Sequence, residues 1–397
     1  MSKTKIPHIM VDAFPMVDDH FSGIGRYTVG IVKGLDELAG EGKLTYSLIV
    51  PRHWIDRIYK YRLQNYKKII RSPIPNRIMR GFMKHHWRIP SNLFLGRGIY
   101  YFPSFLAWPM WGAKSSVVVH DVTYLATPEC VSEGNRKYLT QTVPFSLENS
   151  HNVISVSNFS KTEIMKYYNY PEDKIFVATP SINRRHFYKR SEEEIRRVRL
   201  KYDIYEEDYI FSVGNIEPRK NYVRLIQAYT KLPLKIASKY PLVIVGAGAW
   251  DDEEIREQIQ EAKEQGYKII NPGRYVPDDD MPALYSGAKF FAFVPIYEGF
   301  GMSPLEAYAC KTPVLASNIA SVPEAAGDAA AYCDPLNVDD ILDKLQFMIR
   351  ETERDRSQWN KKMEKRLKSL TWRKSAEITA AALTDLPVEH FQKGGKK

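Results

Sequence analysis

Short apolar runs recur along the first half of the chain, and a stretch with helical spacing follows each of them. These runs predict strands at residues 8–14, 44–50, 99–102, 116–120 and 153–156. The second half repeats the alternation and predicts strands at residues 209–213, 241–245, 268–270, 290–294 and 313–316. Strands that alternate with helices form mostly parallel sheets with helices on their faces. The pattern therefore predicts an α/β fold with two Rossmann-like halves.

A densely charged stretch, residues 183–208, interrupts this alternation. We place the boundary there, so that residues 1–182 form an N-terminal domain and residues 183–371 form a C-terminal domain. A length of 397 residues agrees with two domains rather than one. Two doubly wound halves joined by a linker predict a cleft, with ligands at the carboxyl ends of the strands.

Composition narrows the class of protein. No apolar stretch approaches the roughly 18 residues that a membrane-spanning helix needs. The N-terminus leads into a short strand rather than into a signal-peptide core. Cys130, Cys310 and Cys333 are odd in number and lack metal-ligand spacing. They are typical of free thiols in a reducing cytoplasm.

The net charge of +10 is unevenly spread, because residues 52–88 alone carry a formal +10. This segment holds eleven Lys or Arg residues and a single acid, Asp56, with aromatic residues between them. Such a mixture suits an anionic membrane surface or a nucleic acid, and a solvated face without a partner is the alternative. No nucleic-acid-binding module is recognisable elsewhere, so we favour the membrane.

A glycine-rich loop, residues 298–303, follows the strand predicted at residues 290–294. Glu298 begins this loop, and Glu306 lies in the helix that follows it. Backbone N–H groups at a helix start favour a bound anion, and glycines let the backbone approach that anion closely. A carboxylate beside the anion is suited to accept hydrogen bonds from ribose or hexose hydroxyls. The loop therefore predicts a nucleotide-sugar site.

The helix start has a second interpretation. Ser303, Pro304 and Glu306 fit a capping box, with Ser at the N-cap, Pro at the first helical position and Glu two positions later. Glu306 would then hold the helix end, a role that is compatible with ligand binding. Glu298 precedes the turn and has no part in the box.

A basic pair, Arg219 and Lys220, follows the strand predicted at residues 209–213 and opens a helix predicted at residues 219–230. Cations normally avoid a helix N-terminus, because the dipole is positive there. Their presence is explained if a diphosphate lies between them and the loop opposite. An exposed basic turn is the alternative.

Two candidates lie in the first half. Gly23 and Gly25 belong to a turn, Phe21 to Tyr27, that lacks the third glycine of the dinucleotide fingerprint. The turn is either a plain tight turn or one that closes over phosphates. His120 ends a predicted strand, where it can hydrogen-bond a substrate hydroxyl, or it is a structural histidine.

Together these motifs resemble the retaining glycosyltransferases of family 4, or glycosyl transferases group 1, which have the GT-B architecture. The matching motifs lie in family order, at residues 23–27, 120–121, 155–160, 214–221 and 298–306. The resemblance implies two Rossmann-like domains that face each other across a cleft, with the acceptor side in the first and the nucleotide sugar in the second. It also implies a C-terminal helix, at about residues 372–397, that crosses back to the first domain with Trp372 at the crossover.

The resemblance implies that the enzyme moves a sugar from a nucleoside diphosphate to an acceptor hydroxyl, with retention and without a metal or other cofactor. His120 would lie near the sugar, Glu298 would contact its hydroxyls, and Lys220 would neutralise the leaving diphosphate. The implied nucleotide-sugar-binding residues are Gly23, Gly25, Arg219, Lys220, Arg274, Tyr275, Val276, Glu298, Gly299, Phe300, Gly301, Met302, Ser303 and Glu306. Within this set, Arg274 to Val276 would grip the nucleobase and Glu306 the ribose.

One position departs from the family pattern. Many members carry Arg where this chain has Asn215, so phosphate neutralisation depends on fewer cations, with Arg219 or Arg26 compensating. The reaction class is unaffected, and the individual phosphate contacts stay open.

We therefore expect a hexosyltransferase of cell-surface polysaccharide (lipopolysaccharide) synthesis, with GDP-mannose favoured as donor and a glycan or lipid-linked glycan as acceptor. It would be cytoplasmic and peripheral to the inner face of the cell membrane, held there by residues 52–88, and would bind no nucleic acid. A nucleotide-sugar epimerase of the same fold and a basic nucleic-acid-binding protein are the alternatives. The sequence leaves open the sugar, the nucleobase, the acceptor, the linkage and the oligomeric state.

Overall fold

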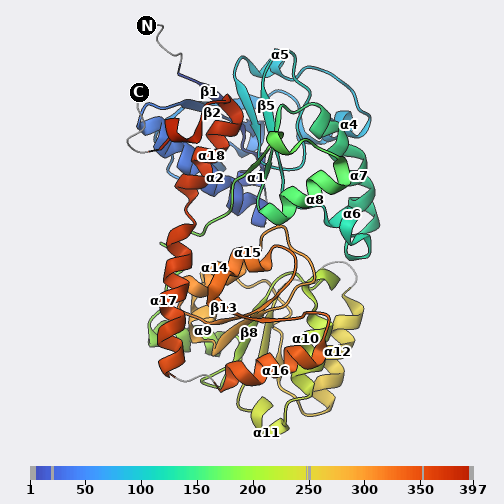
Figure 1. Cartoon of the computed structure of the whole chain (residues 1–397), viewed down its shortest axis with the longest axis vertical. Helices are drawn as coiled ribbons and strands as arrows, with labels where there is room; N and C mark the ends of the chain where they lie inside the picture. Colours follow the sequence, from blue (N-terminus) through green and yellow to red (C-terminus); the bar gives the residue numbers. More distant parts are fainter. Residues whose placement is uncertain (1–5, 19–21, 247, 249–251, 351–352, 393–397) are drawn as a thin grey trace. The chain divides into compact units, whose positions relative to one another are not determined.

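The computed structural model describes residues 6–18, 22–246, 248, 252–350 and 353–392, and the chain divides into two compact units (Figure 1). The first unit comprises Met1–Ser181 and Leu370–Lys397, and the second comprises Ile182–Ser369. The last residues of the chain therefore belong to the first unit.

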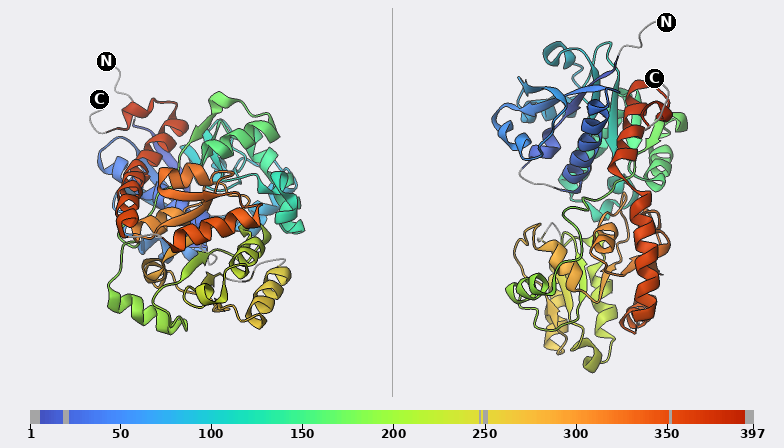
Figure 2. Two further views of the ribbon diagram at one scale, coloured as in Figure 1. Left: turned by 60° about the horizontal axis from the view of Figure 1, so that its bottom comes forward. Right: turned by 90° about the vertical axis from the view of Figure 1, so that its left-hand side faces the viewer.

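The first unit is built on a parallel sheet, which has seven strands within the described residues, in the order β3-β2-β1-β4-β5-β6-β7. The strands are β1 His8–Asp12, β2 Thr45–Pro51, β3 Tyr66–Ser72, β4 Ile99–Phe102, β5 Ser115–Val119, β6 Asn152–Ser155 and β7 Ile175–Val177. The helices are α1 Phe14–Val17, α2 Gly23–Gly40, α3 Asp56–Tyr59, α4 Asn76–Lys84, α5 Asn92–Leu95, α6 Thr123–Ala126, α7 Glu133–Glu148, α8 Asn158–Tyr168 and α18 Trp372–Thr384. Helices α2 and α18 flank the sheet on one side, and α7 and α8 flank it on the other (Figures 1 and 2).

The second unit is built on a parallel sheet with six described strands, in the order β10-β9-β8-β11-β12-β13. These strands are β8 Ile210–Val213, β9 Leu242–Val245, β10 Ile269–Ile270, β11 Phe290–Phe293, β12 Val314–Ser317 and β13 Ala330–Cys333. The helices are α9 Glu192–Lys201, α10 Tyr222–Thr230, α11 Leu234–Ala237, α12 Glu253–Glu264, α13 Met281–Gly287, α14 Ser303–Ala309, α15 Val322–Ala326, α16 Val338–Ile349 and α17 Glu353–Ser369. The two parallel sheets confirm the predicted α/β fold.

The structure adds three strands that the apolar pattern does not predict, namely β3, β7 and β13. Strand β3 lies at the edge of the first sheet and falls inside the basic segment. It exposes Lys67, Lys68 and Arg71, and charged side chains on an edge strand oppose pairing with another chain. Part of the basic segment is therefore explained by the sheet itself.

The C-terminal helix α18 packs on α2, which confirms the predicted return to the first unit. Two glycines of α2 make the close approach possible. A Cβ atom at Gly30 would lie 2.2 Å from the Trp372 ring, and one at Gly34 would lie 2.5 Å from the Cβ atom of Ala376. Tyr27, one turn earlier, meets the Trp372 ring edge to face at 5.9 Å.

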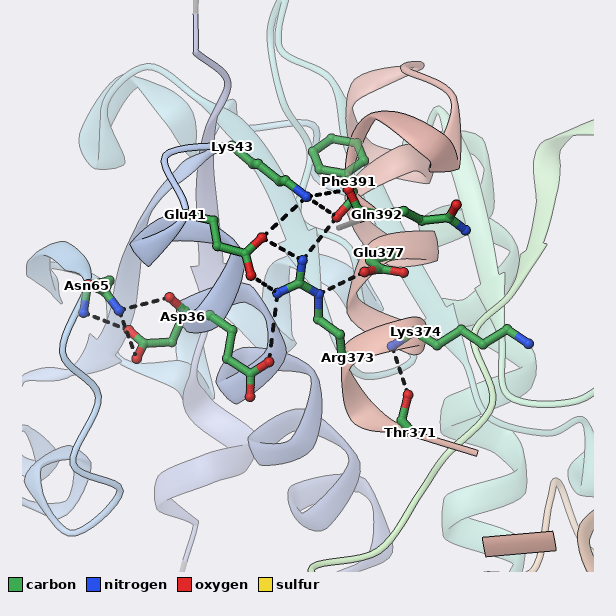
Figure 3. Close-up of polar contacts among 11 residues, drawn as sticks. Asp36, Glu41, Lys43, Asn65, Thr371, Arg373, Lys374, Glu377, Phe391 and Gln392 are labelled. Atoms are coloured by element: carbon green, nitrogen blue, oxygen red, sulfur yellow. Dashed lines mark hydrogen bonds and ion pairs between the residues drawn. The ribbon is translucent and has the colours of Figure 1, made fainter. Parts of the chain in front are cut away.

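Ion pairs hold the outer side of this helix pair (Figure 3). The Arg373 guanidinium donates to both carboxylate oxygens of Glu41, at 2.7 and 2.8 Å, and its Nε donates to Glu377 at 2.8 Å. These hydrogen bonds lower the pKa of Glu41 to about 2. Lys43 donates to the backbone oxygens of Phe391 and Gln392. The end of the described chain is thereby fixed to the first unit.

No helix in the described part of the chain has the length and apolar character needed to cross a bilayer. Cys130, Cys310 and Cys333 are buried, and no disulfide joins these described residues.

Candidate functional site

The glycine-rich loop lies between β11 and α14, at the carboxyl end of a central strand of the second sheet. Helix α14 begins at Ser303, its N-cap is Met302, and no side chain caps it. The predicted capping box is therefore wrong, because Ser303 is already helical. Gly301 takes a positive φ of 87°, which favours glycine. Phe300 is buried, whereas Gly301, Met302 and Ser303 are partly exposed.

The basic pair lies in a 3-10 turn, Pro218–Lys220, after β8. Helix α10 begins only at Tyr222, so the prediction that Arg219 and Lys220 belong to its first turn is wrong. Asn221 separates turn and helix because it adopts a left-handed conformation, with φ of 62°. Its amide donates to the backbone oxygens of Val294 and Pro335, which ties the turn to the end of β11. The two loops are thereby held together.

Both cations of the turn meet the same carboxylate oxygen. Lys220 Nζ lies 2.5 Å from Glu298 Oε1, and Arg219 Nη1 lies 3.0 Å from that atom. Arg219 Nε lies 2.7 Å from Glu217 Oε1. The Ser321 hydroxyl donates to the backbone oxygen of Glu298 at 2.7 Å and fixes the start of the loop. The structure thus brings together three of the predicted site residues and adds Glu217.

The electrostatics of this cluster follow from burial and opposite charge. The Glu298 side chain is 11% exposed, and burial by itself raises its pKa. Arg219 and Lys220 outweigh burial, so the pKa of Glu298 lies below its ordinary value. Burial lowers the pKa of the Lys220 ammonium, and Glu298 opposes that shift. Glu298 is therefore an anion at neutral pH, held beside two cations.

Glu306 lies apart from these ion pairs in the interior of the second unit, where it is 5% exposed. Its Oε2 accepts a hydrogen bond from the Tyr285 hydroxyl at 2.9 Å. Burial raises the pKa of Tyr285 well above its usual range, so this phenol keeps its proton and donates. Tyr285 therefore orients the carboxylate predicted to hold the ribose.

The predicted nucleobase residues have three different surroundings. The Arg274 guanidinium donates to the backbone oxygen of Lys201 at 2.9 Å and lies 5.4 Å from the Tyr202 ring centre. Tyr275 is 74% exposed, whereas Val276 is buried. An exposed aromatic ring is available for stacking, while the Arg274 side chain is occupied locally.

His120 and the glycines Gly23 and Gly25 lie in the first unit. Both glycines belong to the first turn of α2, so the predicted turn before the helix is wrong; Phe21 lies outside the described residues. His120 donates from Nε2 to the Pro103 carbonyl at 2.8 Å, and Tyr27 of α2 contacts its ring edge to face at 5.1 Å. Burial lowers the pKa of His120, so its imidazole is neutral at pH 7.

Two buried carboxylates, Glu217 and Asp12, were not predicted from the sequence as candidate functional residues. Glu217 is 8% exposed. The sequence feature that could have identified it is its position two residues before Arg219. Asp12 ends β1 and is 7% exposed, and its Oδ1 accepts from the Phe14 N–H at 3.1 Å. Burial raises the pKa of Asp12 to about 7. The sequence feature that could have identified Asp12 is its position as a single acidic residue at the end of an apolar strand.

Replacing Asp12 by asparagine should stabilise the first unit more at high pH than at low pH. A raised pKa means that the folded state holds a proton that the unfolded chain releases, so stability is lost as pH rises from about 4 to about 7. Asparagine keeps the acceptor for Phe14 and carries no charge. The increase in the free energy of unfolding caused by Asp12→Asn should be about 2–3 kcal/mol larger at pH 8 than at pH 5. Calorimetric melting at both pH values measures it.

The exposed Asp173 of the same unit provides the control for this variant. Asp173→Asn removes one surface charge and buries nothing. An equal gain for Asp12→Asn at the two pH values would contradict the assignment of a proton to Asp12.

Among the described residues, no group of three or more His, Cys, Asp or Glu side chains is arranged to hold a metal ion. The candidate site of the second unit offers the cations Arg219 and Lys220, the carboxylates Glu217 and Glu298, and the backbone amides of the glycine-rich loop. Two cations beside a glycine loop suit a diphosphate, and the adjacent carboxylate suits hydroxyl groups.

Comparison with known proteins shows that part of the chain, including both loops, is similar to a protein family. The family model of glycosyl transferases group 1 matches residues 192–366, which include both loops. The chain is 35% identical over 243 residues to the O-antigen chain mannosyltransferase B of Escherichia coli, across 61% of this chain and 63% of that protein. It is 31% identical to the serotype-specific mannosyltransferase WbdA of Escherichia coli, across 57% of this chain and 28% of that protein. The match spans less than two thirds of either relative.

The fold is found in solved structures as well. The crystal structure of Anabaena HepE in complex with UDP and glucose superposes with a TM-score of 0.69 and 14% identity, and the match covers 96% of this chain and all of that one. Such low identity supports the two-sheet GT-B fold alone. Residues 192–366 of this chain are similar to the glycosyl transferases group 1 family.

Proposed function

We propose that this chain is a retaining mannosyltransferase that transfers mannose from GDP-mannose to a glycan or lipid-linked glycan during O-antigen synthesis. Two relatives named as mannosyltransferases share at least 31% identity with it over more than half of its length. The observation that carries the proposal is the cluster in which Arg219, Lys220 and Glu298 meet beside the glycine loop.

The cluster matches the charge changes of glycosyl transfer. The leaving diphosphate gains negative charge as the bond to the sugar breaks, and Lys220 and Arg219 are positioned to neutralise it. Backbone N–H groups of residues 299–303 would add donors to phosphate and sugar. Neither Glu298 nor Glu306 is required as a nucleophile, because the leaving phosphate can accept the proton of an acceptor that attacks from the same face. A trapped glycosyl adduct on either carboxylate would contradict this route.

The remaining proposed roles follow the local surroundings. Glu306, oriented by Tyr285, would hold the ribose, and the segment from Arg274 to Val276 would hold the nucleobase. Neutral His120 of the first unit would meet the sugar, and the start of α2 with Gly23 and Gly25 would serve the phosphates or the acceptor. The first unit would bind the acceptor and the second the nucleotide sugar.

Product analysis tests the proposed activity. Radiolabelled GDP-mannose is incubated with membranes that carry the lipid-linked acceptor, and label should enter the glycan. Donor alone should yield no epimer, which separates the transferase from an epimerase. A thermal-shift screen against GDP, UDP, ADP and dTDP identifies the base, and GDP should give the largest shift. Stabilisation by UDP alone would overturn the choice of GDP-mannose.

We also propose that α4 and the residues after it dock on anionic membrane. Helix α4 exposes Arg77, Ile78, Arg80 and Lys84, and the exposed Trp87 follows it. A basic helix with exposed apolar side chains is suited to the surface of an anionic bilayer.

Three side chains in the earlier part of the basic segment, Trp54, Arg57 and Tyr61, contact the protein instead. Trp54 stacks on Phe14 with 5.6 Å between ring centres, and the Arg57 guanidinium lies 4.7 Å from the Trp54 ring centre. Arg57 also donates to the backbone oxygen of Val17, and the Tyr61 hydroxyl donates to that of Met16. We therefore assign docking to residues 76–88 rather than to the whole of residues 52–88.

Removing two cations from α4 should weaken vesicle binding more than removing two from β3. Each basic residue near an anionic surface contributes about 1 kcal/mol, so Arg77→Gln with Arg80→Gln should lower the partition coefficient by about 30-fold. Lys67→Gln with Lys68→Gln removes the same charge from the sheet edge. Co-sedimentation with vesicles containing phosphatidylglycerol measures both. Equal losses for the two pairs would contradict docking by α4.

A further inference from the structure

The charged cluster of the second unit is electrically balanced before any ligand arrives. It contains two carboxylates, Glu217 and Glu298, and two cations, Arg219 and Lys220. The side chains of all four are at most 24% exposed. Oε1 of Glu298 is the atom shared by both cations, at 3.0 and 2.5 Å. The groups proposed to bind the diphosphate are therefore already occupied by a carboxylate.

A diphosphate must compete with the Glu298 carboxylate for the N–H donors of Lys220 and Arg219. Its oxygens would meet a cluster whose formal charges cancel, and a second anion beside Glu298 would add like-charge repulsion. This repulsion favours binding in which the diphosphate displaces the Glu298 carboxylate from Lys220 and Arg219. The backbone at Glu298 stays fixed during this exchange, because Ser321 holds its carbonyl oxygen at 2.7 Å.

The displaced carboxylate needs new partners. Its side chain is 11% exposed, and a buried carboxylate without hydrogen-bond donors is strongly unfavourable. Hydroxyl groups of a sugar attached to the diphosphate can supply those donors. A nucleoside diphosphate that has lost its sugar cannot supply them, so the carboxylate then competes to return to the cations.

We infer that Glu298 is an exchangeable counter-ion that makes the site prefer an intact sugar nucleotide to the free nucleoside diphosphate. The inference rests on the proposed function, and it adds a role in product release to the same site. Glu217 has a different part, because it contacts Arg219 on Nε, away from the Nη1 atom that meets Glu298. Glu217 is thus a positioning residue for Arg219.

Binding of GDP and GDP-mannose to three proteins, measured by titration calorimetry, tests this inference. The proteins are the wild type, Glu298→Gln and Glu217→Gln. Glu298→Gln keeps the shape of the side chain and removes its charge, so GDP should bind about tenfold or more tightly, or about 1.4 kcal/mol. GDP-mannose should gain less or lose affinity, because a charged acceptor for its hydroxyls is gone. Glu217→Gln should weaken both ligands, since Arg219 loses its partner.

The outcomes separate the inference from the function beneath it. Unchanged or weaker GDP binding by folded Glu298→Gln, with GDP bound by the wild type, overturns the counter-ion role and leaves the function standing. Failure of the wild type to bind GDP, UDP, ADP or dTDP overturns both. If Glu298→Gln does not fold, Glu298→Ala replaces it, with the same tightening of GDP expected.

Discussion

Replacing Lys220 by methionine should lower kcat/KM for the proposed sugar transfer by about 10²–10³-fold while leaving the fold intact. A preorganised donor to developing negative charge contributes this much in other enzymes, through the transition state rather than through the ground state. Lys220 is suited to that role because its side chain is only 13% exposed and its Nζ lies 2.5 Å from Glu298 Oε1. Methionine retains the length and apolar body of the side chain. The loss should appear mainly in kcat, measured by initial rates over a range of donor concentrations.

A lysine in the same unit provides the control. Lys231 pairs with Asp339 at 2.6 Å, and its side chain is 50% exposed. An exposed pair contributes at most about 1 kcal/mol to stability, so Lys231→Met should leave the rate within twofold. Circular dichroism and melting temperature establish that both variants are folded. A rate for Lys220→Met near that of the wild type would remove Lys220 from the catalytic step.

The fold was predictable where apolar residues follow one another in a short continuous run. Buried central strands such as β1 and β11 are continuous apolar runs, which parallel sheets favour. Strand β3 was missed because its apolar pair, Ile69 and Ile70, is flanked by the basic residues Lys67, Lys68 and Arg71 at a sheet edge. Strand β13, Ala330–Cys333, is short and only partly buried, so it has little apolar signal. Whether a strand could be predicted from its apolar residues therefore depended on its position in the sheet, which the sequence alone does not give.

The sequence predicted the two loops of the candidate site, but it did not predict that Lys220 of one loop contacts Glu298 of the other. Residues Lys220 and Glu298 are 78 positions apart, and only the pairing of β8 with β11 places their loops at the same end of the sheet. The helix start was misplaced because Asn221 takes a left-handed conformation, which residue type alone does not reveal. The capping box failed for a similar reason, since a matching spacing does not ensure that Ser303 lies outside the helix. Local patterns identified the chemistry, and tertiary structure set the partners.

Gly30→Ala should destabilise the first unit by about 1–2 kcal/mol, because its methyl group would clash with the Trp372 ring. A Cβ atom at this position would lie 2.2–2.4 Å from three atoms of the Trp372 ring. The ring cannot retreat easily, because Tyr27 packs against it. Overpacking of this kind costs about 1–3 kcal/mol, and it acts against the roughly 1 kcal/mol that alanine gains over glycine within a helix.

Gly81 of α4 is the matched control, since it too lies in a helix and a Cβ atom there would meet nothing within 4 Å. Gly81→Ala should therefore raise the melting temperature of the first unit slightly, whereas Gly30→Ala should lower it by several degrees. Calorimetry on the full chain resolves the two changes in direction. A Gly30→Ala protein as stable as the wild type would show that α18 does not pack against α2 in this way.

The double variant Gly30→Ala with Trp372→Leu decides whether the loss comes from the helix contact. Leucine removes the ring atoms that the new methyl group would meet, so the two substitutions together should cost less than the sum of their separate effects. If the losses of stability caused by the two substitutions are additive, the destabilisation by Gly30→Ala arises elsewhere in α2 and not from the contact with Trp372. The contact matters beyond stability, because the chain passes from the second unit to the first between Ser369 and Leu370, immediately before α18. A loosened α18 would free this connection, so a variant that melts early should also lose transfer activity at temperatures below its melting point.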